Sequence, residues 1–236
     1  MSVNLNTKIA LIMNENSYPG REYLSKILEK NLVVDVIIIG NFHETNEIEE
    51  IRCGGLWKPL QMENFKGRFL FFKFLSLTDY NLIEFLKDKK YTIGIQGGTG
   101  IFKYEIIKLF SVGILNFHPG DLPLFRGCSA PEWQLYENKK VISTCHFIDH
   151  GIDSGDILIK KELEVSLTSY ESFRSSIYPQ TSKFMVEVLQ KIILDLDFVN
   201  HSYSQNEKMA IYRKYIGDER ILELKKKLIG FKKKAD

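Results

Sequence analysis

Short, nearly continuous runs of apolar residues constrain the fold of this chain more than any other feature. The first five lie at residues 9–13, 33–39, 69–72, 93–95 and 112–115. Runs of this length and continuity are typical of strands that are buried on both faces of a sheet. We therefore expect each run to be a strand that helices cover on both sides.

Segments with helical spacing lie between these runs. An apolar stripe at residues 23–28 indicates one helix, and another at 82–86 indicates a second, which Thr78 or Asp79 is placed to cap. Strands that alternate with helices in this way form parallel sheets with right-handed crossovers. The pattern therefore predicts an α/β fold with a doubly wound, mostly parallel sheet.

The pattern changes after residue 141. Two β-rich runs, at 141–148 and 157–165, flank a loop at 149–156 that is rich in Gly and Asp. Thr168 and Glu171 have the spacing of a capping box, so we expect a long helix to begin there and to kink near Pro179.

The last part of the chain is polar and rich in Tyr from Asn200 onward, and it ends in a Lys-rich helix around residues 221–229. A core of this kind fits within one large domain. We therefore expect a core domain at 1–195 and a small C-terminal extension at 196–236.

Composition and charge exclude several classes of protein. Hydrophobic residues make up 44% and charged residues 26% of the chain, which argues against long disorder. A net charge of +2 indicates neither a nucleic-acid partner nor a membrane surface. Residues 1–6 lack the order of a secretion signal, and no apolar run approaches the ~20 residues that span a bilayer. We expect a cytoplasmic protein with no membrane partner.

Two further features suggest how a site is built. Residues 41–66 carry an acidic stretch followed by Gly54, Gly55 and Pro59, which predicts a helix and an excursion that shapes a substrate pocket. The three cysteines have no paired spacing, so we expect no disulfide and no metal site. Cys128 is interpreted as a small hydrophobic residue rather than a nucleophile.

Polar side chains follow the fifth apolar run, at the sheet edge where open α/β folds bind ligands. Asn116 and His118 come directly after this run, and Asp153 lies in the later Gly and Asp loop. Attack of an amine on a carbonyl requires a donor to the oxyanion, a proton carrier and an acid that orients the carrier. An amide, an imidazole and a carboxylate meet these needs. On spacing alone, capping and turn roles for Asn116, Asp121 and Asp153 are the alternative.

The residues around this trio resemble the signature of the N10-formyltetrahydrofolate-dependent formyltransferases. The likeness involves Asn116, Phe117, His118, Pro119, Leu122, Pro123, Phe125, Arg126 and Gly127, and then Asp153, Gly155, Ile157 and Leu158. It covers residues 90–165, and both the order and the spacing of the motifs agree. In that family the Asn, the His and the Asp are catalytic, which implies this role for Asn116, His118 and Asp153.

The resemblance also implies N10-formyltetrahydrofolate as co-substrate, in a pocket recognised largely by main-chain groups. The residues implied are Ile95, Gln96, Gly97, Gly98, Thr99, Gly100, Ile101, Phe102 and Asp149. Glycines there let backbone groups approach a pterin closely. A plain glycine turn between strand and helix is the alternative for this segment.

The acceptor amine is less constrained. Residues 126–133 look more like the transfer-RNA and sugar branches of the family than the purine branch. Only a short segment follows the long helix, too short for the extra basic domain of methionyl-transfer-RNA formyltransferase. The phosphate-binding Gly and Ser run of the purine enzyme is absent after Met13. We also expect no regulatory domain of the kind that the formyltetrahydrofolate hydrolases carry.

The compact sugar N-formyltransferases are therefore the preferred resemblance. They formylate nucleotide-linked amino sugars of surface polysaccharides such as lipopolysaccharide O-antigen, and the likeness suggests dTDP-4-amino-4,6-dideoxyglucose as acceptor. Candidate residues for the base and the diphosphate are Lys73, Phe74, Arg126 and Tyr212, with Trp57 and Arg213.

Alternatives stay open at several points. Arg126 is equally suited to a structural fork to carbonyl groups, and His146 and His150 are interpreted as packed or solvated. A phosphoribosylglycinamide formyltransferase and a non-catalytic folate or nucleotide-binding module are the alternative functions. A homodimer through the Tyr-rich segment is a further expectation.

Overall fold

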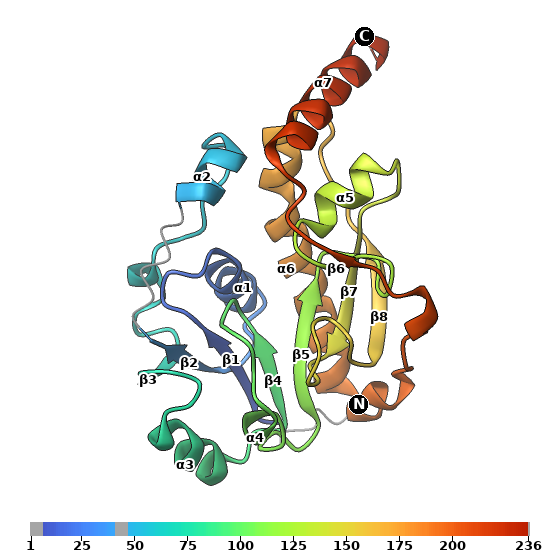
Figure 1. Cartoon of the computed structure of the whole chain (residues 1–236). Coiled ribbons are helices and arrows are strands. Elements are labelled where there is room, and N and C mark those ends of the chain that lie inside the picture. The colour runs from blue at the N-terminus through green and yellow to red at the C-terminus, as the bar shows by residue number, and fades with distance from the viewer. Residues whose placement is uncertain (1–6, 41–46, 236) are drawn as a thin grey trace.

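The computed structural model describes residues 7–40 and 47–235. Within them, seven strands form one sheet in the order β3-β2-β1-β4-β5-β7-β8 (Figure 1). The first five in this order are mutually parallel, whereas β7 pairs antiparallel with both β5 and β8. The strands are β1 (Ile9–Met13), β2 (Asp35–Ile39), β3 (Leu70–Phe74), β4 (Ile93–Gln96), β5 (Gly113–His118), β7 (Ile142–Phe147) and β8 (Ile157–Glu162). The predicted α/β fold with a doubly wound, mostly parallel sheet is confirmed.

Helices connect and cover the strands. They are α1 (Tyr18–Glu29), α2 (Glu47–Cys53), α3 (Tyr80–Lys89), α4 (Tyr104–Ile107), α5 (Ala130–Tyr136), α6 (Tyr170–Leu194) and α7 (Asp218–Ala235). Shorter 3-10 turns are η1 (Met62–Phe65), η2 (Leu196–His201) and η3 (Glu207–Met209). None of the helices in the described part of the chain is long and apolar enough to cross a membrane.

The sheet reverses its direction of growth at β1. The chain moves outward from β1 to β2 and β3, and then returns to place β4 on the other side of β1. Open sheets of this kind leave a crevice at the carboxyl ends of the strands, beside the reversal point. Residues that follow β1, β4 and β5 therefore meet at one edge.

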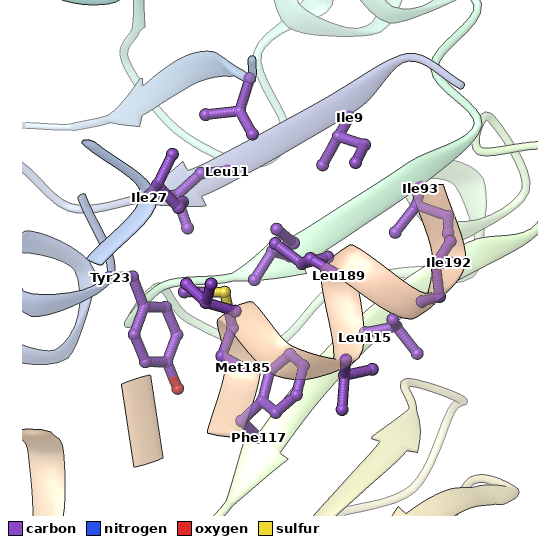
Figure 2. Close-up of a cluster of buried hydrophobic side chains, with 14 of the residues drawn as sticks. Ile9, Leu11, Tyr23, Ile27, Ile93, Leu115, Phe117, Met185, Leu189 and Ile192 are labelled. Carbon is purple, nitrogen blue, oxygen red and sulfur yellow. The ribbon is translucent and has the colours of Figure 1, made fainter. Parts of the chain in front are cut away.

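Alternate residues of each inner strand face opposite layers of the core. Ile9 and Leu11 of β1 pack under α1 and α6, as Figure 2 shows, whereas Ala10 and Ile12 face the layer formed by α3 and the segment around α4. Each large apolar side chain that is fully buried stabilises the fold by ~1.5–3 kcal/mol. The side-chain period of two along the strands is therefore satisfied on both faces.

Several expectations about these elements are corrected by the structure or stay untested. The strand at the sheet edge, β3, is not buried on both faces, because Leu70 and Lys73 are exposed. Thr168 does not cap α6: the cap is Ser169, whose hydroxyl accepts from the Ser172 N–H. The helix runs continuously through Pro179, and the kink expected there stays a prediction. The expectations for residues 1–6, and for the acidic residues at 43–46, lie outside the described residues.

The described part of segment 41–66 forms α2, an irregular connection and η1, as expected. An ion pair of 2.6 Å between Arg174 and Glu49 joins α2 to α6. The role of this segment in shaping a substrate pocket stays a prediction.

The C-terminal segment returns along the edge of the molecule that carries α5 and α6. Its strand β9 (Tyr212–Arg213) pairs in parallel with β6 (Arg126–Gly127). The last helix, α7, buries Leu224 and Leu228 in a cluster that also holds Leu135 of α5 and Phe173 of α6. The division of the chain into a core and a C-terminal extension stays a prediction.

Candidate functional site

Asn116 and His118 lie on β5 and point to the same side of the strand, because they are two residues apart. Phe117 between them points the other way, into the core under α6. In the antiparallel pairing of β5 with β7, Asn116 lies opposite His146. The strand register therefore brings a second histidine to the amide.

The loop between β7 and β8 carries Asp153 back toward the end of β5. The Asp149 Oδ1 atom accepts hydrogen bonds from the Gly151 N–H at 2.9 Å and the Ser154 hydroxyl at 2.6 Å, which tightens the loop. Asp153 itself has a left-handed backbone, with φ of 52°. A Cβ atom on Gly155 would lie 2.0 Å from the Phe147 carbonyl oxygen, so this close turn requires glycine.

The three residues of the predicted trio lie together at this edge of the sheet. The Nδ1 atom of His118 is 3.5 Å from Asp153 Oδ2, and the Asn116 Nδ2 atom donates to Asp153 Oδ1 at 3.4 Å. The Gly127 N–H donates to Asp153 Oδ2 at 2.8 Å. Segments far apart in the chain, at β5, β6 and the Asp153 loop, therefore converge on one carboxylate.

The ring of His118 is oriented by a backbone carbonyl. Its Nε2–H donates to the Phe125 carbonyl oxygen at 2.7 Å, which leaves Nδ1 as the ring atom able to accept a proton. His118 is 7% exposed, and its burial lowers the pKa of the imidazole below its ordinary value, while the charge of Asp153 acts in the opposite direction. The ring is therefore neutral near pH 7 and lies beside a group that stabilises its charged form.

The carboxyl group of Asp153 is ionised over the whole neutral range. Burial raises its pKa, but the charge of His118, the hydrogen bond and charge of His146 and the Gly127 N–H outweigh burial, and the pKa falls to about 2. A carboxylate in such surroundings is an electrostatic partner for a protonated imidazole rather than a proton donor.

His146 joins the trio, although sequence reasoning interpreted it as packed or solvated. Its Nδ1–H donates to the Phe147 carbonyl at 2.8 Å, so its Nε2 atom accepts from the Asn116 amide at 3.1 Å. The same Nε2 atom lies 3.6 Å from Asp153 Oδ1. The sequence contained one signal for this: His146 lies in the β-rich run 141–148, which forms the strand β7 next to β5 in the sheet. His150, by contrast, is exposed.

A cavity of about 230 Å³ opens beside Asn116 and Asp153. Six of the residues predicted for the co-substrate line it: Gln96, Thr99, Gly100, Ile101, Phe102 and Asp149. Its wall also includes His146, Ile148, Gly151 and Ile152. The cavity therefore combines apolar surface and loop backbone next to the trio.

The other predicted co-substrate residues have packing roles. Ile95 is buried within the sheet. A Cβ atom on Gly97 would lie 2.8 Å from Leu11 Cδ1, and one on Gly98, whose φ is 85°, would lie 2.1 Å from Ser17 Oγ. Gly97 and Gly98 thus form the turn after β4. The Gln96 Oε1 atom stabilises this turn by accepting from the Gly98 N–H at 2.8 Å.

The residues predicted for the acceptor fall into two groups: Lys73 and Phe74 are neighbours on β3, and Arg126 and Tyr212 are register partners in the pairing of β6 with β9. Lys73 forms an exposed ion pair of 2.7 Å with Glu15, and Phe74 packs against the ring of Phe85. Tyr212 is exposed on β9.

Three further candidates have protein partners. Trp57 donates to Glu22 Oε2 at 3.2 Å, and Arg213 pairs with Glu137 at 2.6 Å. Arg126 is buried and forks to the Gln205 side-chain oxygen and the Glu207 carboxylate, and its role at the acceptor stays a prediction.

Across residues 7–40 and 47–235, no group of three or more His, Cys, Asp or Glu side chains is arranged to hold a metal ion. The three cysteines, all in the described ranges, are free. Cys53 and Cys145 are buried, while Cys128 is exposed and not packed as expected.

Comparisons with known proteins point to one family. Residues 98–189 match the family model described as Formyl transferase. A cytosolic 10-formyltetrahydrofolate dehydrogenase from Xenopus tropicalis is 35% identical over 91 residues, which is 37% of this chain and 10% of that protein. A methionyl-tRNA formyltransferase from Thermodesulfovibrio yellowstonii is 32% identical over 93 residues, which is 39% of this chain and 30% of that protein. The chain thus matches at most about a third of these two relatives.

Solved structures share the fold over most of the chain. An N-formyltransferase from Helicobacter canadensis in complex with folinic acid and dTDP-3-aminofucose has a TM-score of 0.61 at 17% identity, covering 97% of this chain and 82% of its own. A phosphoribosylglycinamide formyltransferase from Streptococcus pneumoniae has a TM-score of 0.56 at 19% identity, covering 79% of this chain and 98% of its own.

Proposed function

We propose, from the premise that residues 98–189 belong to the formyl transferase family, that this chain transfers a formyl group from N10-formyltetrahydrofolate to an amine. The observation that carries the proposal is that an amide and a neutral imidazole each lie within 3.5 Å of one ionised carboxylate, and that the amide and the carboxylate line a cavity. Formyl transfer needs each of these groups, and the proposed catalytic residues are Asn116, His118 and Asp153.

Each proposed catalytic residue has one role. The acceptor amine attacks the formyl carbon, and an Asn116 N–H donates to the carbonyl oxygen as it gains negative charge. His118 Nδ1 takes the proton that the amine loses, and Asp153 stabilises the resulting imidazolium. The bond between the formyl carbon and the folate nitrogen then breaks, and His118 returns the proton to that nitrogen.

The cavity beside Asn116 suits the proposed donor. Gln96, Thr99 and Gly100 supply loop backbone on one side, while Ile101 and Phe102 supply apolar surface. A flat, polar-edged pterin ring needs both. Bound there, the donor would present its formyl group toward Asn116 and His118.

We further propose a nucleotide-linked amino sugar as the acceptor, with dTDP-4-amino-4,6-dideoxyglucose as the first choice. The solved sugar enzyme from Helicobacter canadensis covers 97% of this chain, including the C-terminal segment, whereas the purine enzyme covers 79%. That difference supports the sugar branch. The use in surface polysaccharide, the cytoplasmic location and the homodimer stay predictions.

A mass-based assay tests the proposal. The chain is incubated with N10-formyltetrahydrofolate and, in turn, with dTDP-linked and UDP-linked amino sugars, glycinamide ribonucleotide and charged initiator transfer RNA. We expect a gain of one formyl unit on a nucleotide amino sugar. Formylation of glycinamide ribonucleotide instead would assign the alternative purine function.

Two matched variants assign the chemistry. His118→Asn should abolish transfer and leave the thermal unfolding temperature close to that of the parent chain. His150→Asn alters an exposed histidine of the neighbouring loop and should leave the rate unchanged. A parent chain that binds both ligands and never turns over would support the non-catalytic module.

A further inference from the structure

A glutamine from the C-terminal segment reaches the loop that carries Asp153. Gln205 is 9% exposed, and both polar atoms of its side chain have protein partners. Its Nε2 atom donates to the carbonyl oxygens of Asp153 at 2.9 Å and Gly155 at 2.7 Å. Its Oε1 atom accepts from the Arg126 guanidinium at 2.8 and 3.1 Å.

Backbone pairing holds Gln205 in this place. Tyr203 and Ile157 exchange two backbone hydrogen bonds of 2.9 Å, which fixes the chain just before Gln205 against the start of β8. Farther along, β9 pairs with β6. The segment 203–213 is therefore attached to the molecule on both sides of Gln205.

Arg126 connects the same glutamine to the carboxylate of Asp153. Arg126 is followed by Gly127, whose N–H donates to Asp153 Oδ2 at 2.8 Å. Gln205 thus contacts the backbone of Asp153 directly and, through Arg126, the strand that binds its carboxylate. The backbone carbonyl and the carboxylate of Asp153 are therefore both linked to the side chain of Gln205.

The loop needs such an external support. The left-handed backbone of Asp153, with φ of 52°, is disfavoured for residues with a Cβ atom and persists only where surrounding contacts hold it. Buried carbonyl groups also require donors. The Gln205 amide meets that requirement for two carbonyls of the loop.

We infer that Gln205 is a positioning residue, which holds the Asp153 carboxylate beside His118 and makes the C-terminal segment part of the reaction centre. The inference rests on the proposed function, which gives the Asp153 carboxylate its role in stabilising the His118 imidazolium. It assigns the segment 203–213 a purpose beyond stability.

The test is the pair of variants Gln205→Glu and Glu207→Gln in the full chain. Glutamate has the shape of glutamine and still accepts from Arg126, but its carboxylate cannot donate to the loop carbonyls and repels them. Gln205→Glu should lower kcat by about tenfold to a hundredfold, as displaced catalytic groups do, and leave KM for both substrates within about twofold. Glu207→Gln removes only the ion pair of Arg126 with an exposed carboxylate and should retain kcat.

A second readout does not depend on turnover. The pKa of the His118 imidazole is followed by NMR of labelled histidine, with His118→Asn to assign the signal. This readout uses Gln205→Met, which also removes the donor but adds no second carboxylate near the ring. Because the charge of Asp153 raises this pKa, a displaced Asp153 should make it fall further in Gln205→Met, and Glu207→Gln should leave it unchanged. Loss of global stability alone would not move it.

The outcomes separate the inference from the proposed function. Parental kcat in Gln205→Glu together with an unmoved His118 pKa in Gln205→Met overturns the inference, and so do equal losses of kcat in Gln205→Glu and Glu207→Gln. A parent chain without transferase activity overturns the proposed function, and the NMR titration then still decides whether Gln205 holds Asp153 beside His118.

Discussion

The orientation of the Asn116 amide is determined by His146. Because His146 Nδ1–H is bonded to a carbonyl, its Nε2 atom offers a lone pair, and the Asn116 NH2 group must turn toward it. One N–H of Asn116 is then held by His146, and the other makes the longer contact of 3.4 Å with Asp153 Oδ1. We expect this longer contact to give way when the N–H turns toward a reacting carbonyl. A flipped amide would present an oxygen there and repel the oxyanion.

Replacing His146 by Phe tests this role. The variant keeps a ring of similar size in a buried place but removes the acceptor. We expect kcat to fall by about tenfold to a hundredfold, less than the ~10²–10³-fold loss seen when an oxyanion donor itself is removed, because the Asn116 amide is misoriented rather than lost. His146→Gln, whose amide oxygen can accept from Asn116, should recover part of the rate. Steady-state kinetics decide, with thermal unfolding as a control; full activity of His146→Phe would remove His146 from the site.

The pH dependence of the reaction follows from the pKa of His118. Only neutral His118 can take a proton, and burial places its pKa below 6.5. We therefore expect kcat/KM to rise with pH along a limb below 6.5 and to be flat above it.

Asp153→Asn removes the charge that raises this pKa, so the limb should move to still lower pH while the plateau falls. Profiles of kcat/KM between pH 4.5 and 8.5 measure both. A limb that moves upward in the variant would contradict the assignment of His118 as the base.

At the level of the secondary-structure elements, two neighbouring residues, Thr168 and Ser169, are candidates for the N-cap of α6. Thr168 and Glu171 match the capping-box spacing, yet Ser169 is the cap and Glu171 pairs with Lys225 of α7 at 2.7 Å. Thr168 instead shares a hydrogen bond with the Ser166 hydroxyl. Glu171, which a capping box with Thr168 would require, is therefore engaged in a tertiary ion pair instead.

Substitution at the two positions tests this start of α6. Ser169→Ala should lower the free energy of unfolding by about 1 kcal/mol, because the Ser172 N–H loses its acceptor. Thr168→Ala should change it by less than about 0.5 kcal/mol, as surface substitutions do. Urea denaturation of both variants measures the difference, and equal losses would show that neither hydroxyl is the cap.

For the whole molecule, the C-terminal helix shares its core with the main body. Leu224 and Leu228 of α7 are fully buried with residues of α5 and α6. A helix that shares a core should unfold together with its neighbours. We therefore expect a single thermal transition for the described chain.

Leu228→Ala should cost about 2–5 kcal/mol of unfolding free energy, the usual range for a buried leucine. Leu222→Ala alters a leucine of the same helix that is 57% exposed and should cost little. Calorimetry distinguishes the outcomes. Two separate transitions, or no loss in Leu228→Ala, would mean that α7 folds independently of the body.

Local patterns in the sequence determined the sheet and the trio. Continuous apolar runs mark the inner strands because burial on both faces leaves no polar alternation, and the run 9–13 coincides with β1. Asn116 and His118 share one side of β5 because a strand repeats every two residues. The edge strand β3 differs, since strand order, which no local pattern encodes, leaves it with a neighbour on one side only.

Tertiary structure decided the contacts that surround the trio. The amide of Asn116 meets His146, and Gln205 meets the Asp153 loop 52 residues away and Arg126 79 residues away. Such contacts depend on strand register and on the path of the C-terminal segment rather than on neighbouring residues. Periodicity reports which side of an element is buried, whereas only the folded chain determines which distant side chain lies against it.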